Sequence, residues 1–538
     1  MQIVSDDWKN AHTRPLLNET FVEVALNIAD PKAIANASSQ DNGAIYISDS
    51  SELTDGLDTT PIPYGTLEQN IWCLDGGRKA LPESNFGENG YVGDVLSDET
   101  CVFSTKLPTI TISFTEVFKK SIPGITIVWS NTYNEFADTF EVIAYKGDTI
   151  VASKEVTGNR SVTNLVLVEI PEYNKIVIIV KKWCLPYHRV RVEDVYVGLR
   201  KVYGKSKLFD YSHKQTVDPV STSLPKFEIK FSIDNLDGEY NPHNAEGLSK
   251  FLMERQEIKA KYGMKMDDGS IKWIKGGTFY LSEWYAKQNG MTADFTARDL
   301  LEFMSGTYHD DAYITNYNTI KSQGRSLASL AESILSGAEL PSPSDGSPAW
   351  VIDESLGKIT TKAPLPVDTR ANCLQLIANA GECVIYPDRN GTIRIEPLKF
   401  DEPDYSIDSF NSYSKSEITL AKPIKQVNIK VHTYSLEGND IKDSSTEVVV
   451  SSGTEGETIT VDNPLVTDTT RAQSLGEWLT THLGHRMTLD SSWRADVRLD
   501  ALDLVTNKND YNTQTVRMTD VEFKYNGAFR GTGKGKVI

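Results

Sequence analysis

Short runs of alternating apolar and polar residues recur along most of this chain, and clusters of turn residues separate them. The clearest run covers residues 225–233, in which four apolar residues share one face of an extended strand: Phe227, Ile229, Phe231 and Ile233. Residues 140–145 and 149–152 flank the turn Lys146-Gly147-Asp148 and predict a β-hairpin. Strands with this pattern are stable only when their apolar faces are buried against each other, so we predict a mainly β fold.

Helical spacing of apolar residues is confined to the second half of the chain. Residues 326–335 and 372–380 predict helices, and each is followed by a glycine that can end it, Gly337 and Gly381. Asn390-Gly391 then predicts a hairpin between residues 383–386 and 392–395. We therefore expect a smaller α+β part at residues 301–419, and one further helix at 470–483.

The length of 538 residues favours three or four domains. Residues 65–198 form a self-contained series of short strands without a convincing helix, which predicts a β-sandwich inserted into a first β-domain. The expected division is a first β-domain from residues 1–64 plus 200–300, the inserted sandwich at 65–198, the α+β domain at 301–419, and a second β-domain at 420–538.

The charge balance limits the partners of the chain. Its 55 basic and 74 acidic residues give a formal charge of −19. Tight binding of a nucleic-acid backbone depends on Lys and Arg that neutralise phosphates, so this balance argues against a protein that holds DNA. It does not exclude a protein that DNA passes, because an acidic surface repels DNA and keeps it from adhering.

The cysteines and the apolar segments indicate where the protein is made. Five cysteines occur without a CxxC pair, which favours free thiols in a reducing cytoplasm over a zinc site or a disulfide framework. The first seven residues lack the features of a signal peptide, so we expect release by cell lysis. The longest strongly apolar run, Ile176–Val180, is far too short to span a bilayer.

No sequence pattern indicates catalysis, a metal or a cofactor. The chain contains no GxSxG elbow, no P-loop and no HExxH motif. The acidic loop Asp234–Glu239 has Leu236 where a calcium loop needs an oxygen ligand, so a tight turn is the simpler interpretation. His482 and His485 lie three residues apart on a predicted helix and lack a third ligand. We therefore expect no enzyme activity, no metal and no cofactor.

The inserted sandwich carries the residues best suited to bind a ligand. Aromatic rings can stack on the apolar faces of sugars while polar groups bond the hydroxyls. Two predicted loops hold such residues, which we take as candidate carbohydrate-binding residues: Trp129, Tyr133, Trp183, Tyr187, His188 and Arg189. The alternative is that these rings fill the sandwich core or contact a neighbouring chain.

Four segments resemble tail-tip, or baseplate hub, proteins of phages and prophages of Gram-positive bacteria: Phe231–Pro242, Gly276–Trp284, Phe295–Phe303 and Thr519–Gly531. The resemblance implies a structural virion protein at the distal end of the tail, made in the host cytoplasm. It implies a homotrimer in which two β-barrel domains per chain form a ring that continues the tail tube. The implied partners are a distal tail protein ring, the tape-measure protein, and DNA as passing cargo.

The insert resembles the discoidin-like, galactose-binding sandwich of carbohydrate-binding modules, on its strand pattern and on Leu74-Asp75-Gly76. This likeness implies attachment to a glycan of the host cell wall. Two other functions stay open. A stand-alone cell-surface glycan-binding protein predicts a signal peptide or an anchor. A tail-associated peptidoglycan hydrolase predicts a catalytic domain beyond the hub-like segment that ends near Ile538.

Overall fold

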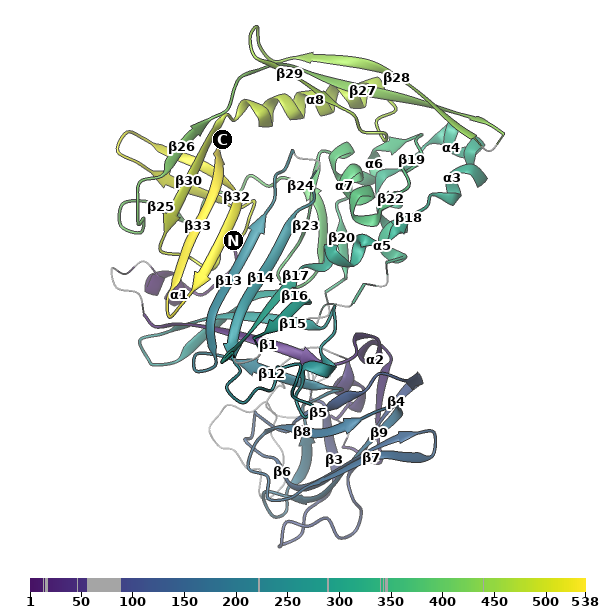
Figure 1. Ribbon diagram of the computed structural model, residues 1–538, viewed down its shortest axis with the longest axis vertical. Helices are drawn as coiled ribbons and strands as arrows, with labels where there is room; N and C mark the ends of the chain where they lie inside the picture. Colours follow the sequence, from purple (N-terminus) through teal and green to yellow (C-terminus); the bar gives the residue numbers. More distant parts are fainter. Residues whose placement is uncertain are drawn as a thin grey trace.

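The computed structural model describes residues 1–12, 14, 18–45, 47–55, 89–220, 223–287, 290–338, 340–341, 343, 347–438 and 440–538. The chain is mainly β with a smaller helical part, which confirms the predicted fold class. Figure 1 shows a large sheet at the centre, the α+β part on its right, the inserted strands below it, and a long hairpin covered by one helix above it.

A thirteen-stranded sheet forms the centre of the molecule. Eleven of its strands follow one another in space in this order: β12 (Leu199–Tyr203), β1 (Thr20–Ile28), β15 (Glu257–Lys265), β16 (Ile271–Ala286), β17 (Thr292–Arg298), β14 (Lys226–Asp234), β13 (Leu208–Thr216), β32 (Thr513–Tyr525), β33 (Phe529–Val537), β30 (Met487–Trp493) and β26 (Glu417–Leu420). Two short strands, β25 (Ser406–Ile407) and β31 (Leu504–Lys508), join it beside β32.

The junction between β13 and β32 unites the two β-domains expected from the sequence. These strands are antiparallel, with Tyr211 opposite Tyr525 and Thr216 opposite Asp520. Most strands of the two predicted barrels therefore belong to one open sheet, whereas the strands within residues 424–461 form a separate sheet, and none of the sheets in the described ranges closes into a barrel. The predicted barrels do not close because β13 pairs along its second edge with β32 and not with another strand of its own domain.

The alternation read from the sequence separates the two faces of this sheet. Phe227, Ile229, Phe231 and Ile233 are all buried, as predicted, and they pack in one core with Tyr211, Phe295 and Phe523. In β33 the buried positions are Phe529, Gly531, Gly533 and Gly535, and a Cβ on Gly531 would lie 2.9 Å from the Trp493 ring. Glycine is required there because β33 lies directly on that ring.

The insert is a sandwich of small sheets with its own core. Its largest sheet has five strands, in the order β2 (Ala37–Asp41), β4 (Thr109–Phe118), β9 (Tyr173–Trp183), β6 (Ala137–Lys146) and β7 (Thr149–Val156). The facing strands are β11 (Asp194–Tyr196), β5 (Ile122–Val128) and β8 (Thr163–Ile170), with the pair β10 (Arg189–Val192) and β3 (Tyr91–Leu96). Two short helices precede β3, α2 (Pro31–Ala35) and η1 (Ser50–Thr54).

The insert begins earlier in the chain than expected. Strand β2 pairs with β4, and Ala33 and Leu53 belong to the core of the sandwich. The division into domains stays a prediction, and these contacts would move its first boundary from residue 64 to before Ala37. Cys73 and the segment Leu74-Asp75-Gly76 lie outside the described residues.

The α+β part packs helices on a three-stranded sheet. The sheet consists of β20 (Trp350–Ile352), β24 (Ile393–Pro397) and β23 (Cys383–Pro387). Its helices are η3 (Leu300–Ser305), α3 (Asp311–Thr315), α4 (Tyr317–Gln323), α5 (Leu327–Ser336), α6 (Ser355–Lys358) and α7 (Arg370–Ala380). Two short strand pairs complete it, β18 (Thr307–Tyr308) with β22 (Asp368–Thr369) and β19 (Arg325–Ser326) with β21 (Thr360–Thr361).

Local signals place these helices where the sequence predicted them. The Ser326 hydroxyl caps α5 by accepting from the backbone N–H of Ser329, and Gly337 follows its last turn. Thr369 caps α7 in the same way, and Gly381 ends it. The predicted hairpin at Asn390-Gly391 joins β23 to β24, with Gly391 at a positive φ of 89°.

The remaining elements lie at the top of the molecule and at the N-terminus. A sheet of β28 (Asp440–Ser451), β27 (Ile424–Glu437) and β29 (Glu457–Val461) packs one face on α8 (Thr469–Gly484), the helix predicted at 470–483. Near the N-terminus α1 (Asp6–His12) packs on the large sheet, and η2 (Ser249–Phe251) follows β14. No helix in the described part of the chain is long and apolar enough to cross a membrane.

Candidate functional site

Two of the six predicted carbohydrate-binding residues belong to the core of the insert. Trp129 and Trp183 are both 0% exposed, and their ring centroids lie 5.9 Å apart in an edge-to-face contact. The Trp183 indole N–H donates to Glu135 Oε2 at 2.9 Å. Neither ring has a face open to a ligand, so these two tryptophans are structural. This is the alternative that the sequence had left open.

His188 and Tyr133 support the loops. His188 is buried, and its Nδ1 lies 3.0 Å from Glu135 Oε1, so one carboxylate joins His188 to Trp183. The Arg191 guanidinium covers one face of the Tyr133 ring, at 4.3 Å from its centroid. Glu135 is the residue that holds this group together, and sequence reasoning missed it because acidic residues are common in this chain.

Tyr187 is the one candidate ring that is largely exposed. It is 48% exposed, beside Leu185 at 41%. Arg189 follows on β10, where its guanidinium donates to the backbone carbonyls of Gly93 and Asp94. Tyr187 and Arg189 are thus close in sequence, but the Arg189 head group is engaged by the backbone of β3.

Three loops meet at Tyr187, residues 97–102, 130–136 and 184–188, which we call the loop end of the insert. The backbone N–H of Tyr187 donates to Ser97 and that of Cys184 to Phe136. Each loop has one non-glycine residue at positive φ: Cys101 at 69°, Asn134 at 54° and Tyr187 at 58°. Such backbone strain is costly and gathers at binding sites, where the surrounding structure holds it in place.

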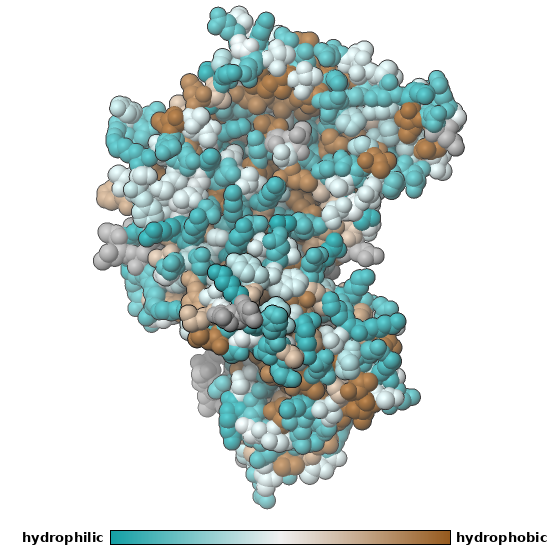
Figure 2. Space-filling model, in the orientation of Figure 1, coloured by the Kyte–Doolittle hydropathy of each residue, from teal (hydrophilic) through white to brown (hydrophobic). Residues whose placement is uncertain are grey.

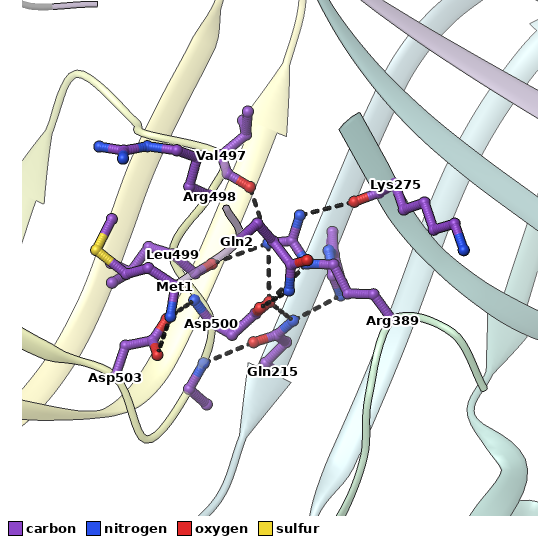
Figure 3. A network of polar contacts seen from close by, with 12 residues as sticks. Met1, Gln2, Gln215, Lys275, Arg389, Val497, Arg498, Leu499, Asp500 and Asp503 are labelled. Atoms are coloured by element: carbon purple, nitrogen blue, oxygen red, sulfur yellow. Dashed lines mark hydrogen bonds and ion pairs between the residues drawn. The ribbon is translucent and has the colours of Figure 1, made fainter. Parts of the chain in front are cut away.

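A second polar group lies where the α+β part meets the large sheet (Figure 3). Arg389, from the turn between β23 and β24, is 6% exposed and inserts between the two halves of the sheet. Its Nε donates to Asp500 Oδ1 at 2.8 Å, and its remaining nitrogens donate to the carbonyls of Lys275, Val497 and Leu499. Gln215 of β13 donates to the same Asp500 oxygen at 2.8 Å.

Electrostatics keep this junction charged. Burial alone would raise the pKa of Asp500, but the Arg389 charge together with hydrogen bonds from Gln215, Gln2 and Arg389 holds that pKa below its usual value. Burial, together with the Asp500 charge, raises the pKa of Asp503. A cavity of about 490 Å³ opens beside these residues. Its lining comes from the N-terminal segment, both halves of the sheet and the α+β part, so the junction connects these parts of the molecule.

The outward face of the large sheet is polar across both halves. One cross-strand row runs Arg298, Glu228, Lys214 and Glu522 over β17, β14, β13 and β32. Opposite charges directly across a sheet attract, so this row reinforces the pairing of β13 with β32. Figure 2 shows hydrophilic residues over the middle of this view, where these strands lie in Figure 1.

The sequence offered two candidate metal sites and predicted that neither binds a metal. Asp234–Glu239 is a turn in which Asn235 Oδ1 accepts from the backbone N–H of Tyr240 at 2.8 Å. His482 and His485 have ring centroids 6.3 Å apart, and burial lowers the pKa of His482 to about 4. No group of three or more metal-ligating side chains occurs within the described ranges.

Solved structures similar to this chain include phage tail proteins and a component of the type VI secretion system. A tail protein from Neisseria meningitidis MC58 is 13% identical, with a TM-score of 0.42 over 63% of this chain and 94% of that one. The 43 kDa tail protein of prophage MuSo2 from Shewanella oneidensis is 11% identical, with a TM-score of 0.40 over 62% and 95%. A prophage tail protein from Listeria monocytogenes EGD-e is 9% identical, with a TM-score of 0.36 over 63% and 92%. No protein-family model and no curated protein matches the chain.

Proposed function

We propose that this chain is a structural protein of a phage tail tip, that three copies form a baseplate hub, and that its role is assembly and not catalysis. The observation that carries the proposal is the pairing of β13 with β32, which makes one continuous sheet from the two β-domains. All four hub-like segments lie on this sheet or directly beside it, beginning on β14, β16, β17 and β32. The resemblance therefore follows one structural unit, as expected for a shared scaffold.

The junction at Arg389 supports a mechanical role in the assembly. A buried ion pair with its backbone partners joins the α+β part to both halves of the sheet. A hub that transmits force along a tail needs such connections. The polar, charge-alternating sheet face supports the passage of DNA, because it offers neither an apolar patch nor a purely basic surface to which DNA would adhere.

The proposed partners follow from a place at the tip of the tail. A distal tail protein ring would contact the hub from the tail side, and the tape-measure protein would end within it. The division into two β-domains, an α+β domain and an inserted sandwich belongs to the same proposal.

The assembly state tests the proposal. Light scattering on a sizing column should give a species near three times 59.8 kDa, and negative-stain images of that species should show a ring with a central channel. A strict monomer at high protein concentration, without rings, would contradict the trimeric hub.

A second role is favoured by one observation, the positive φ of Tyr187 and of one residue in each of the two loops that meet it, Cys101 and Asn134. We propose that the loop end of the insert contacts a glycan of the host cell wall, with Tyr187 as the stacking ring. Binding of the full chain to purified host cell walls should weaken at least tenfold in Tyr187→Ala. The matched control is Leu167→Ala, which removes a side chain 57% exposed on β8. Equal binding by both variants would contradict this role. Glycan binding by a chain that stays monomeric would favour the stand-alone binding protein.

A further inference from the structure

A small hollow opens beside the end of α8, where β33 approaches that helix in Figure 1. Its lining comes from the segment after β13, the end of α8, β32 and β33. The volume of the hollow is about 20 Å³. A space of about 10–15 Å³ holds one water molecule, so the hollow has room for one small polar group.

Four of the side chains that line the hollow are basic: Arg517, Lys536, His482 and His485. Arg517 on β32 lies directly opposite Lys536 on β33. His482 lies on the last turn of α8, and His485 directly follows the helix. Like charges directly opposite each other destabilise the pairing of two strands. An anion between these side chains would replace this repulsion by attraction.

Arg517 is a buried cation without an ion-pair partner among the described residues. It is 4% exposed, and its two terminal nitrogens donate to the carbonyls of Leu502 and Lys399. Its Nε is buried and has no hydrogen-bond partner in the described part of the chain. Burial lowers the pKa of this guanidinium, and Asp503 and Asp401 oppose that effect from the side of the large cavity. Arg517 therefore keeps one donor that the protein itself does not use.

Asp218 is the acidic side chain that lines the hollow, and it is already engaged. Its carboxylate lies 3.7 Å from Lys536 Nζ and accepts from the backbone N–H of Val220. An exposed ion pair of this kind contributes little. Within the described ranges no ion pair joins the carboxylate of Ile538, which also lines the hollow, to a cation. The positive charges of the hollow are therefore only partly balanced.

The two histidines are kept neutral by their surroundings. Neither ring forms a hydrogen bond in the part of the chain that the structure describes, and the Trp478 ring contacts His482 at 4.8 Å between centroids. Burial, and then the charges of His485, Arg517 and Lys536, lower the pKa of His482 to about 4, while Asp218 acts in the opposite direction. Burial lowers the pKa of His485 as well. An anion in the hollow would favour the protonated rings.

We propose that the hollow binds one oxyanion group, a sulfate, phosphate or carboxylate, held by Arg517, Lys536 and His482. Hydrogen bonds from Arg and Lys to such groups are strong because both partners are charged. The bound group would also strengthen the pairing of β32 with β33. Two sources carry this chemistry, a free ion from solution and an acidic side chain of a neighbouring copy. The site goes beyond the proposed function, because a free ion can bind to a single chain.

Inorganic sulfate is the first probe, because its charge stays constant over the pH range in which the histidines titrate. Isothermal titration calorimetry of the full chain, at an ionic strength held constant with sodium chloride, should show one saturable site per chain. Lys536→Gln should raise the Kd of sulfate at least tenfold. The matched control is Lys534→Gln on the same strand, whose side chain is 57% exposed and lies beside Asp490. It should keep the wild-type Kd.

Two results of this titration would overturn the proposal. The first is a wild type without saturable sulfate binding. The second is an equal Kd for Lys536→Gln and Lys534→Gln. Far-UV circular dichroism and the unfolding midpoint confirm that each variant is folded.

The pH dependence of binding tests the role of His482. Because the anion favours the protonated ring, binding takes up protons, and the Kd of sulfate should fall as the pH falls from 7 to 5. In His482→Gln this dependence should be weaker, although the variant still binds sulfate at pH 7. The control is His309→Gln, which alters an exposed histidine outside the hollow. A wild-type pH dependence in His482→Gln would remove His482 from the site.

Light scattering in saturating sulfate separates the two sources. Sulfate competes with an acidic side chain, so a mass that falls in sulfate and not in chloride of equal ionic strength assigns the group to a neighbouring copy. An unchanged mass assigns it to a free ion. A wild type that binds sulfate and remains monomeric contradicts the trimeric hub and leaves the oxyanion site intact.

Discussion

Arg389 and Asp500 are 111 residues apart in the chain and form a buried ion pair, in which Nε donates to Oδ1 at 2.8 Å. The pair joins the β23–β24 turn to the loop after β30. Replacing Arg389 by Met leaves the Asp500 carboxylate buried without its cation, so we expect a loss of about 3–5 kcal/mol in the free energy of unfolding. Urea unfolding followed by tryptophan fluorescence measures it.

The control for this change is Arg160→Met, which removes an arginine whose side chain is 75% exposed and paired with Asp138. Its loss should stay below about 1 kcal/mol. The double variant Arg389→Met with Asp500→Asn should recover part of the loss, because the buried charge is then gone as well. Equal losses for Arg389→Met and Arg160→Met would show that the junction contributes no more than a surface pair.

Asp299 should make the protein less stable as the pH rises. It is buried, and burial raises its pKa to about 7 although its carboxylate accepts from the backbone N–H groups of Phe227 and Leu301. The stabilisation by Asp299 is complete below the pKa of this carboxyl in the unfolded chain, about 4, and is lost as the pH rises towards 7. In Asp299→Asn, whose amide oxygen can accept the same bonds, the fall between pH 4 and 7 should shrink by a few kcal/mol. An unchanged slope in chemical denaturation would refute the shifted pKa.

His213 should have the opposite pH dependence. Burial, and then the nearby Arg389 charge, lower its pKa to about 3, and its Nδ1 lies 2.8 Å from the Tyr262 hydroxyl. The neutral ring stabilises the fold above pH 6.5, and this contribution is lost as the pH falls towards 3. In His213→Gln the loss of stability below pH 6.5 should be shallower by up to about 1.4 kcal/mol per pH unit. Free energies of unfolding measured at pH 7, 6 and 5 for both proteins test this prediction. Parallel pH curves for the wild type and His213→Gln would contradict the lowered pKa of His213.

Gly533 should not tolerate a side chain. A Cβ at this position would lie 2.2 Å from the backbone oxygen of Asp520, which cannot move without breaking the β32–β33 pairing. Gly533→Ala should therefore lower the free energy of unfolding by about 1–3 kcal/mol. The neighbour Thr532 is exposed, and Thr532→Ala should change it by less than about 0.5 kcal/mol. Equal effects would show that β33 can shift away from β32.

Local patterns were enough to predict the elements of this fold. The alternation at 225–233, the helix ends at Gly337 and Gly381 and the Asn390-Gly391 turn depend on residues close together in sequence, and the structure has each where it was expected. The merging of the two β-domains into one sheet was not predictable, because a strand pattern identifies the buried face and not the partner at each edge. Residues 211–216 give no sign that their partner is 520–525.

The candidate site shows the same limit more sharply. Trp129 and Trp183 have the residue type expected of a sugar-binding ring, yet their burial depends on strands that are distant in the chain. Glu135 and Arg389 became evident only through contacts 53 and 111 residues away. Tyr187 was the candidate whose exposure agreed with the prediction, because it lies in a loop and not at the end of a strand.

The β13–β32 pairing can form only late in the synthesis of this protein, because its two strands are far apart in the chain. Thr216 and Asp520, which bond across it, are separated by 304 residues. At roughly 5–20 residues per second, β13 waits about 15–60 s after its own synthesis before its partner strand emerges. During that interval its free edge can pair with the same edge on a neighbouring nascent chain. Productive synthesis of this protein is therefore expected to depend on chaperones that shield this edge, and to suffer first when translation slows between residues 216 and 520.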